Sequence, residues 1–94
     1  MNAQDLTLNI AVNLGRVSRW APEGKKARIE QFLIETENFV EQLKNTKKNE
    51  RFQKTFNSFY KHFYQFRNRV EYNVQWAEET LTWANILSHR AKLA

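Results

Sequence analysis

Residues that form turns are scarce in this chain, and their scarcity restricts the fold more than any other feature. The 94 residues include only two Gly and one Pro. A β-sandwich or β-barrel needs a turn signal roughly every 8–12 residues, which this composition does not supply. Hydrophobic residues make up 41% of the chain, as in ordinary globular proteins, so we expect a buried core. The sequence therefore predicts one all-α domain that spans residues 1–94.

Apolar residues three or four positions apart predict a first helix from about Gln4 to Arg19. The residues that form this stripe are Leu6, Ile10, Leu14 and Val17. Gly15 lies inside the helix, where Gly costs about 1 kcal/mol relative to Ala. Either it ends the helix early or it admits a close neighbour. The segment from Trp20 to Gly24 holds the only Pro and predicts the first turn.

A second helix is expected from about Glu23 to Lys44, with Pro22 at its start, where the missing N–H is not needed. Its buried stripe is predicted to consist of Ile29, Phe32, Leu33, Thr36, Phe39, Val40 and Leu43. Glu side chains occupy its other faces, and no basic residue lies between Glu30 and Glu41. A polar loop follows, and Asn49 at its end is a suitable N-cap for the next helix.

Gly and Pro are absent from the whole segment 50–92. Its first apolar residues form a regular stripe, which predicts a helix with five core Phe side chains: Phe52, Phe56, Phe59, Phe63, Phe66 and then Val70. Two consecutive steps of four at Val70 shift the heptad phase, so the segment forms either one long helix or two helices with a break or bend near 68–72. We favour the break, because Asn68 and Glu71 have the spacing of a capping box. The expected fold is a small bundle of three to four helices.

Basic residues are concentrated on one face of the predicted third helix. The chain has a net charge of +5, and residues 44–69 alone contain eight basic side chains and one acidic side chain, a net +7. Such a row of donors suits the phosphate backbone of RNA or DNA. The alternative is an exposed face that is only solvated, or one paired with the Glu-rich second helix. The row opposite the Phe stripe comprises Arg51, Lys54, Ser58, Lys61, Gln65 and Arg69, joined by Lys47 if the helix starts early.

Trp76 and Trp83 are seven residues apart, so they are expected to share one face of the last helical segment. An apolar seam is predicted beside them, formed by Val74, Ala77, Leu81 and Ala84. Because Trp is common in interface hot spots, this face is a candidate for docking to other subunits or for self-association. The alternative role of the two indoles is to anchor the core.

Nothing in the sequence predicts catalysis. The lack of Cys excludes thiolate nucleophiles, disulfides and Cys-based zinc sites. Neither His62 nor His89 has a carboxylate three or four residues away, so no metal site, cofactor site or catalytic pair is predicted. The N-terminus lacks the features of a signal peptide, and apolar runs reach only three residues. We expect a cytoplasmic protein without a membrane segment.

The chain resembles the small subunit of CRISPR effector complexes in its size, its helical pattern and the row formed by Arg51, Lys54, Lys61 and Arg69. This resemblance implies a helical bundle that holds nucleic-acid backbone inside a ribonucleoprotein of antiviral defence. A rival resemblance is to the accessory variability protein of diversity-generating retroelements, a basic four-helix bundle that forms a pentameric barrel and binds RNA. This second resemblance rests on the turn at Pro22 and on the aromatic-rich last helix.

Two functional hypotheses follow from these patterns. In the first, the protein is a non-enzymatic subunit that binds RNA or DNA backbone within a larger assembly. In the second, it is a protein–protein interaction module that uses the face of Trp76 and Trp83. Salt separates them, because backbone binding weakens steeply with ionic strength and hydrophobic docking does not.

Overall fold

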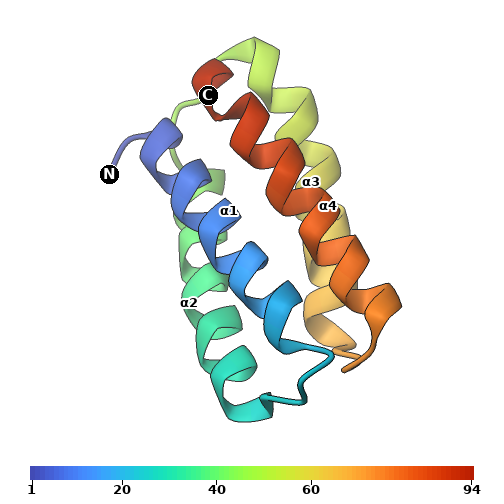
Figure 1. Cartoon of the computed structure of the whole chain (residues 1–94). Helices are drawn as coiled ribbons and strands as arrows, with labels where there is room; N and C mark the ends of the chain where they lie inside the picture. The colour runs from blue at the N-terminus through green and yellow to red at the C-terminus, as the bar shows by residue number, and fades with distance from the viewer.

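The computed structural model describes all 94 residues and contains helices but no strands. Successive helices run in opposite directions along a bundle that is 37 Å long (Figure 1). The prediction of a small all-α bundle is confirmed, and the segment 50–92 forms two helices separated by residues 69–73. The elements are α1 (Ala3–Trp20), α2 (Lys26–Lys44), α3 (Glu50–Asn68), α4 (Val74–Arg90) and the short 3-10 helix η1 (Ala91–Leu93).

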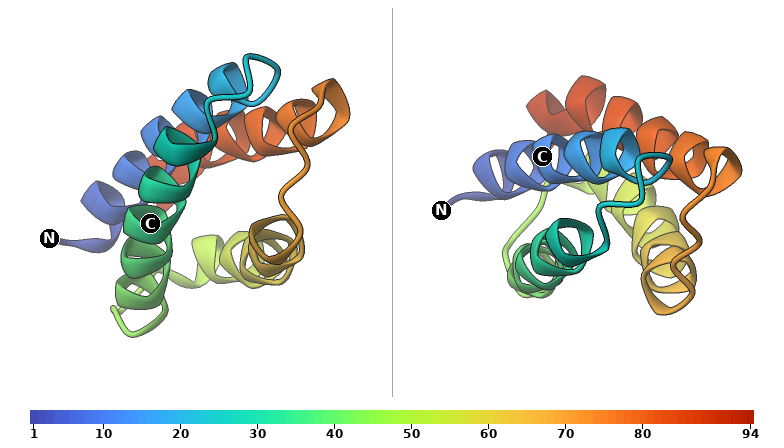
Figure 2. Two further views of the ribbon diagram at one scale, coloured as in Figure 1. Left: turned by 90° about the horizontal axis from the view of Figure 1, so that it is seen from below. Right: turned by 60° about the horizontal axis from the view of Figure 1, so that its bottom comes forward.

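Helix α1 lies between α2 and α4 and packs closely on both (Figure 2). The distance between packed helices depends on the side chains at the contact, so small residues allow close approach. Helix α3 stands further from its neighbours, because its buried face consists of Phe side chains. The small side chains that are buried on α1 and α4 are Ala3, Thr7, Ala11 and Ser18 on the first helix, and Ala77, Thr80 and Ala84 on the second.

The Phe side chains of α3 fill the centre of the bundle, as predicted. Their rings pack on one another, with centroids 5.6 Å apart for Phe59 and Phe63 and 5.5 Å apart for Phe63 and Phe66. On α2 the predicted stripe is buried except for Phe32 and Phe39, which lie partly exposed at its edges. None of the helices combines the length with the hydropathy that a membrane-spanning segment requires. The five Phe that are confirmed as buried are Phe52, Phe56, Phe59, Phe63 and Phe66.

The turn between α1 and α2 is longer than the sequence analysis predicted. Helix α2 begins at Lys26 instead of Glu23, and Pro22 lies in the turn. Gly24 lies between α1 and α2 and adopts a φ of +68°. This left-handed conformation cannot continue a right-handed helix, and residues other than Gly rarely adopt it. Gly15, by contrast, neither ends α1 nor receives a close neighbour, since no atom lies within 4 Å of where a Cβ would stand.

The predicted capping box at Asn68 is wrong, because the N-cap of α4 is Asn73. The Asn73 side chain accepts a hydrogen bond of 2.9 Å from the backbone N–H of Trp76. The Trp76 indole N–H then donates to the carbonyl of Phe66, 3.0 Å away, in the last turn of α3. A carbonyl at a helix end has no partner within its own helix, so this indole satisfies one of the free acceptors of α3.

Helix α4 also buries a different face from the one predicted. Val74 and Leu81, two members of the predicted seam, are exposed, whereas Ala77 and Ala84 are buried. The buried face is completed by Trp76, Thr80 and Leu87. The helix is turned so that small side chains meet the closely packed α1, and the larger Val74 and Leu81 are left at the surface.

Candidate nucleic-acid interface

The predicted row of polar and basic side chains lies on the surface of α3. The side of α3 opposite its Phe stripe faces solvent, and the row follows that side over nearly the whole helix. Asn49 begins the helix as predicted, since its side chain accepts a hydrogen bond of 3.0 Å from the N–H of Arg51. The row members that α3 exposes are Arg51, Lys54, Ser58, Lys61 and Gln65.

The two ends of the predicted row do not belong to the helix. Lys47 is exposed in the loop before Asn49, so it does not extend the α3 surface. Arg69 follows the last residue of α3 and adopts a non-helical conformation. Its guanidinium Nε lies 3.3 Å from a carboxylate oxygen of Glu71, and this pair is largely exposed. Arg69 is therefore partly neutralised and stands apart from the other cations.

A groove between α3 and α4 brings part of the row together with three residues of α4. Its volume is about 350 Å³, and no acidic residue lines it. Arg90, in the last turn of α4, reaches across and donates a hydrogen bond of 3.3 Å from Nη1 to the Thr55 hydroxyl. The antiparallel packing of α3 and α4 places this C-terminal cation beside the N-terminal cations of α3. The groove is lined by Arg51, Lys54, Thr55, Ser58, Trp83, Ile86 and Arg90.

Trp83 is partly exposed and forms an aromatic wall of this groove. Its ring lies 5.5 Å from that of Phe59 and 5.3 Å from that of His62. The ring of His62 is held by its own helix, with Nδ1 2.8 Å from the carbonyl oxygen of Ser58. The groove thus combines three cations with two hydroxyl groups and one aromatic surface.

Trp76 does not share the exposed face of Trp83. It is only 4% exposed, its single polar atom is bonded inside the protein, and its ring packs edge-on against Phe66. The prediction of a common partner surface for the two indoles is therefore wrong. The physical reason for this error lies at the C-terminus of α3. The carbonyl of Phe66 has no partner within its own helix there, and the buried Trp76 indole N–H donates a hydrogen bond to it.

The remaining basic residues of the segment are occupied within the protein. Lys48 donates hydrogen bonds of 2.6 Å to the carbonyl of Leu43 and 2.9 Å to that of Thr46, so it caps the end of α2. Burial lowers the pKa of its ammonium group. The Lys44 ammonium lies 5.1 Å from the centre of the Tyr60 ring. These cations contribute to the net charge but not to the α3–α4 groove.

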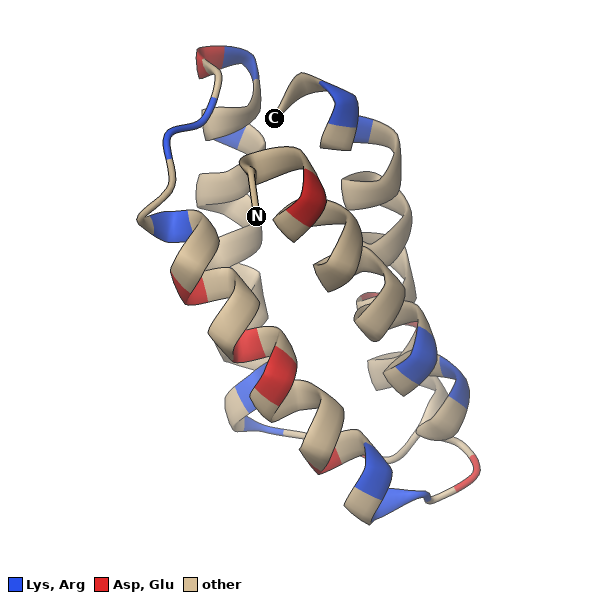
Figure 3. Cartoon of the chain, turned by 90° about the vertical axis from the view of Figure 1, so that its left-hand side faces the viewer, with Lys and Arg blue, Asp and Glu red and all other residues tan.

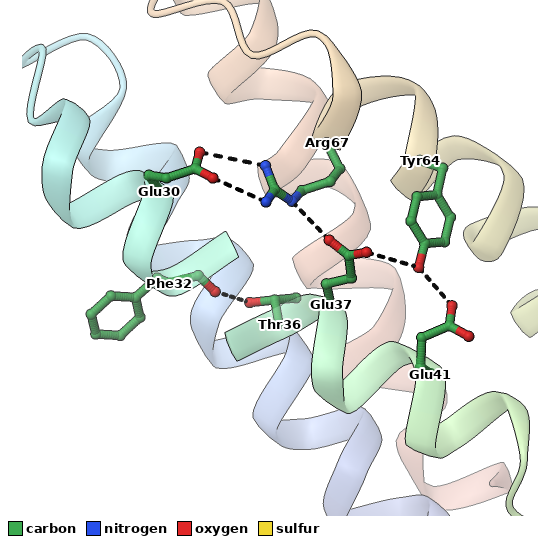
Figure 4. Close-up of polar contacts among 7 residues, drawn as sticks. All are labelled: Glu30, Phe32, Thr36, Glu37, Glu41, Tyr64 and Arg67. Atoms are coloured by element: carbon green, nitrogen blue, oxygen red, sulfur yellow. Dashed lines mark hydrogen bonds and ion pairs between the residues drawn. The ribbon is translucent and has the colours of Figure 1, made fainter. Parts of the chain in front are cut away.

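Arg67 is neutralised by the acidic face of α2. Figure 3 shows the acidic residues along the middle of α2, with basic residues only near its ends. Arg67 Nε lies 3.1 Å from Glu37, and its two other nitrogens contact Glu30 at 3.0 and 3.4 Å (Figure 4). The acidic helix therefore pairs with this edge of α3. On the opposite edge, the groove that α3 forms with the C-terminal half of α4 has no acidic residue in its lining, whereas Glu71 and Glu79 lie near the other end of α3.

Two Tyr side chains extend the same α2–α3 contact. Tyr64 donates a hydrogen bond of 2.6 Å to Glu41, and Tyr60 donates one of 2.8 Å to the same carboxylate oxygen. These two bonds, the Tyr64 bond first, lower the pKa of the Glu41 carboxyl. Burial, and then the bond to Glu41, raises the pKa of the Tyr64 hydroxyl. The hydrogen bonds tie α2 to α3 although their backbones stand apart.

Arg90 is the residue of this site that sequence reasoning missed. It lies in the last turn of α4, and only the antiparallel order of α3 and α4 predicts that it joins Arg51.

No group of three or more acidic or His side chains has a metal-binding arrangement. Comparison of the chain with protein families, curated proteins and solved structures finds no match.

Proposed function

We propose that this protein is a non-enzymatic subunit that binds the backbone of RNA or DNA along the α3–α4 groove. One observation carries the proposal: Arg51, Lys54 and Arg90 converge from two helices on a groove without an acidic residue in its lining. Cations gathered without counter-charges attract a polyanion, and the release of counterions from the phosphates favours binding.

The chemistry of the groove suits phosphates better than it suits base edges. A guanidinium group such as those of Arg51 and Arg90 can donate two parallel hydrogen bonds to one phosphate, whereas Lys54 acts as a point charge. Contacts to phosphate carry no sequence information, so we expect little preference among base sequences. The exposed surface of Trp83 can stack on an unpaired base, which favours single strands over duplexes.

The groove runs along only one end of α3 and so contacts only a short stretch of a strand. We therefore propose that other subunits extend the path of the strand, in a larger ribonucleoprotein assembly in the cytoplasm. The resemblance to the small subunit of CRISPR effector complexes supports this role in antiviral defence through the row of Arg51, Lys54 and Lys61. Arg69 gives that resemblance no support, since it pairs with Glu71. The accessory variability protein of diversity-generating retroelements is the rival family, and it implies RNA as the ligand.

The proposal is tested by the double substitution Lys54→Glu and Lys61→Glu, measured by fluorescence anisotropy with a labelled single-stranded oligonucleotide of mixed sequence. Both side chains are exposed, so the melting temperature should stay close to that of the unmodified protein. If Arg51, Lys54, Lys61 and Arg90 each neutralise one phosphate, the log–log slope of affinity against salt is about −3, at about 0.7 per phosphate of a single strand. The double substitution should abolish binding.

A control of equal charge is available at the other end of the molecule. Lys25→Glu with Lys26→Glu lowers the net charge by the same amount on exposed residues near the start of α2. Binding that survives in this control and disappears in the test variant locates the site at α3. Equal losses in both variants would mean that only the overall charge matters. Undiminished binding by the test variant would show that the basic face is merely solvated.

A further inference from the structure

Most of the large apolar side chains that the protein leaves exposed lie on α1 and α4, two helices that pack together. Six such residues are exposed, and four of them lie on these two helices. Leu8 is 40% and Val12 is 53% exposed on α1, while Val74 is 57% and Leu81 is 45% exposed on α4. Monomeric proteins rarely expose contiguous apolar patches larger than a few hundred Å², and larger patches commonly bind a partner. We call the surface formed by these four residues the α1–α4 seam.

The seam is also free of charge along most of its length. No charged residue occurs between Asp5 and Arg16 on α1, and none occurs between Glu79 and Arg90 on α4. Figure 3 shows the middle of α1 without any coloured residue, in contrast to the acidic middle of α2. An exposed helix face of a solvated bundle is normally charged, whereas the cores of protein interfaces are depleted of charged residues. The uncharged turns of both helices therefore suit a surface that docks to protein.

The shape of the seam suits a partner with the same shape. A groove of about 370 Å³ runs between the two helices at one end of the seam, where Gly15, Ser18 and Ala77 leave space beside Val74 and Leu81. The charged residues Arg19 and Glu78 also line it. The apolar side chains of Leu8 and Val12 project from the same helix pair. A surface that has both a groove and apolar projections can receive a copy of itself, as two-fold symmetric interfaces require.

The charges at the ends of the seam are arranged for a second copy. Asp5 and Arg19 bound it on α1, and Glu78 and Lys92 bound it at α4 and η1. Asp5 and Arg19 are 14 residues apart, about four turns of α1, and therefore lie on similar sides of that helix. Lys92 lies in η1, beyond the end of α4 that is remote from Glu78. None of the four side chains forms an ion pair within the chain. A two-fold axis perpendicular to the helices places each acidic residue opposite the basic residue of the partner copy.

We infer that the α1–α4 seam is the interface of a homodimer, in which α1 packs antiparallel to α1 of the second copy and α4 antiparallel to its α4. The four apolar side chains become buried, and the terminal charges pair between copies. The α3–α4 groove lies on the other side of α4, where Trp83 and Arg90 face α3. The dimer therefore stands independently of the proposed nucleic-acid binding.

The test is the oligomeric state in solution, measured by sedimentation velocity over a range of micromolar concentrations. The unmodified protein should be a dimer, and Leu81→Glu or Val12→Glu should raise the dissociation constant at least about tenfold, since each places an unpaired charge in an apolar interface. Ile34→Glu is the matched control, because Ile34 is 52% exposed on α2, away from the seam. Circular dichroism confirms that each variant is folded before its mass is compared.

The charge arrangement gives a second, more specific test. Glu78→Lys or Lys92→Glu alone sets like charges opposite each other and should weaken the dimer, whereas the two substitutions together should restore it. A monomer at every concentration would overturn the inference, and so would a control variant that dissociates as readily as Leu81→Glu. A dimer that ignores Glu78 and Lys92 would refute the proposed two-fold arrangement.

Discussion

Removing the ring of Phe63 is the most direct test of the helix arrangement. Phe63 is completely buried, and its ring lies 5.1–5.6 Å from those of Phe59, Tyr64 and Phe66. A Phe side chain buries about 150–250 Å², which at about 25 cal/mol per Å² gives an upper estimate of about 4–6 kcal/mol. Phe63→Ala should therefore lower the free energy of unfolding by about 3–5 kcal/mol, as observed for large-to-small changes in packed cores.

The assay is urea unfolding followed by circular dichroism, with Phe39→Ala as the matched control. A domain of this length has a free energy of unfolding of about 5–14 kcal/mol, so Phe63→Ala removes a large part of it. Phe63→Leu, which keeps the site apolar, should cost about 2 kcal/mol at about 0.8 kcal/mol per carbon removed, and it keeps the test valid if the Ala variant does not fold. Phe39 is only partly buried, so its removal should cost about half as much as that of Phe63.

The comparison of the two Phe→Ala variants decides between two arrangements. Sequence periodicity places both side chains in a core stripe, whereas the structure buries Phe63 and leaves Phe39 at the edge of the bundle. Equal losses of stability in the two variants would refute the packing described for α2 and α3. A smaller loss for Phe63→Ala than for Phe39→Ala would mean that the helical phase of α3 is wrong.

Gly15→Ala should raise the free energy of unfolding by up to about 1 kcal/mol, because Ala favours the helix and its methyl group would have no atom within 4 Å. Gly24→Ala should lower the free energy of unfolding by about 1 kcal/mol, because Gly24 has a φ of +68° that Ala rarely adopts. Thermal melts of the two variants measure both changes. The hydrogen bonds that Glu41 accepts from Tyr64 and Tyr60 lower the pKa of its carboxyl below the ordinary value of 4.5. These bonds therefore stabilise the fold at any pH above 4.5, and this stabilisation is lost as the pH falls through the pKa of the folded state. Melts between neutral and acid pH should show a smaller acid-induced loss for Glu41→Gln, and an identical loss would contradict the role given to these bonds.

The parts of the fold that the sequence predicts are those in which one pattern dominates. The five Phe of α3 repeat over about four turns without a competing apolar face, so their burial follows from periodicity alone. Asn49 was predictable as a cap because it directly precedes a helix that contains no Gly or Pro. The break after α3 was predictable from the slip of the heptad phase near Val70.

The errors occur where tertiary contacts choose between two local solutions. Both Asn68 and Asn73 can cap a helix, and the bond from the Trp76 indole to Phe66 accompanies the later start. The register of α4 is set by its close packing on α1, which favours small side chains over the larger Leu81. Hydrophobicity ranks Leu above Ala and therefore predicts the wrong face. No local sequence pattern predicts that Arg90 lies beside α3, because its position depends on the antiparallel packing of α3 and α4.

The pairing of helices, more than the number of charged residues, determines where this protein is basic. Of the eight cations between residues 44 and 69, half are engaged within the chain: Lys44 over Tyr60, Lys48 at the end of α2, Arg67 with two Glu of α2, and Arg69 with Glu71. The acidic residues of α2 thus act on one edge of α3 only. The cations on the other edge have no such partner, and α4 adds Arg90 to them instead of an acid. Cations without acidic partners are in this way gathered at the α3–α4 groove, where they can act on a polyanion.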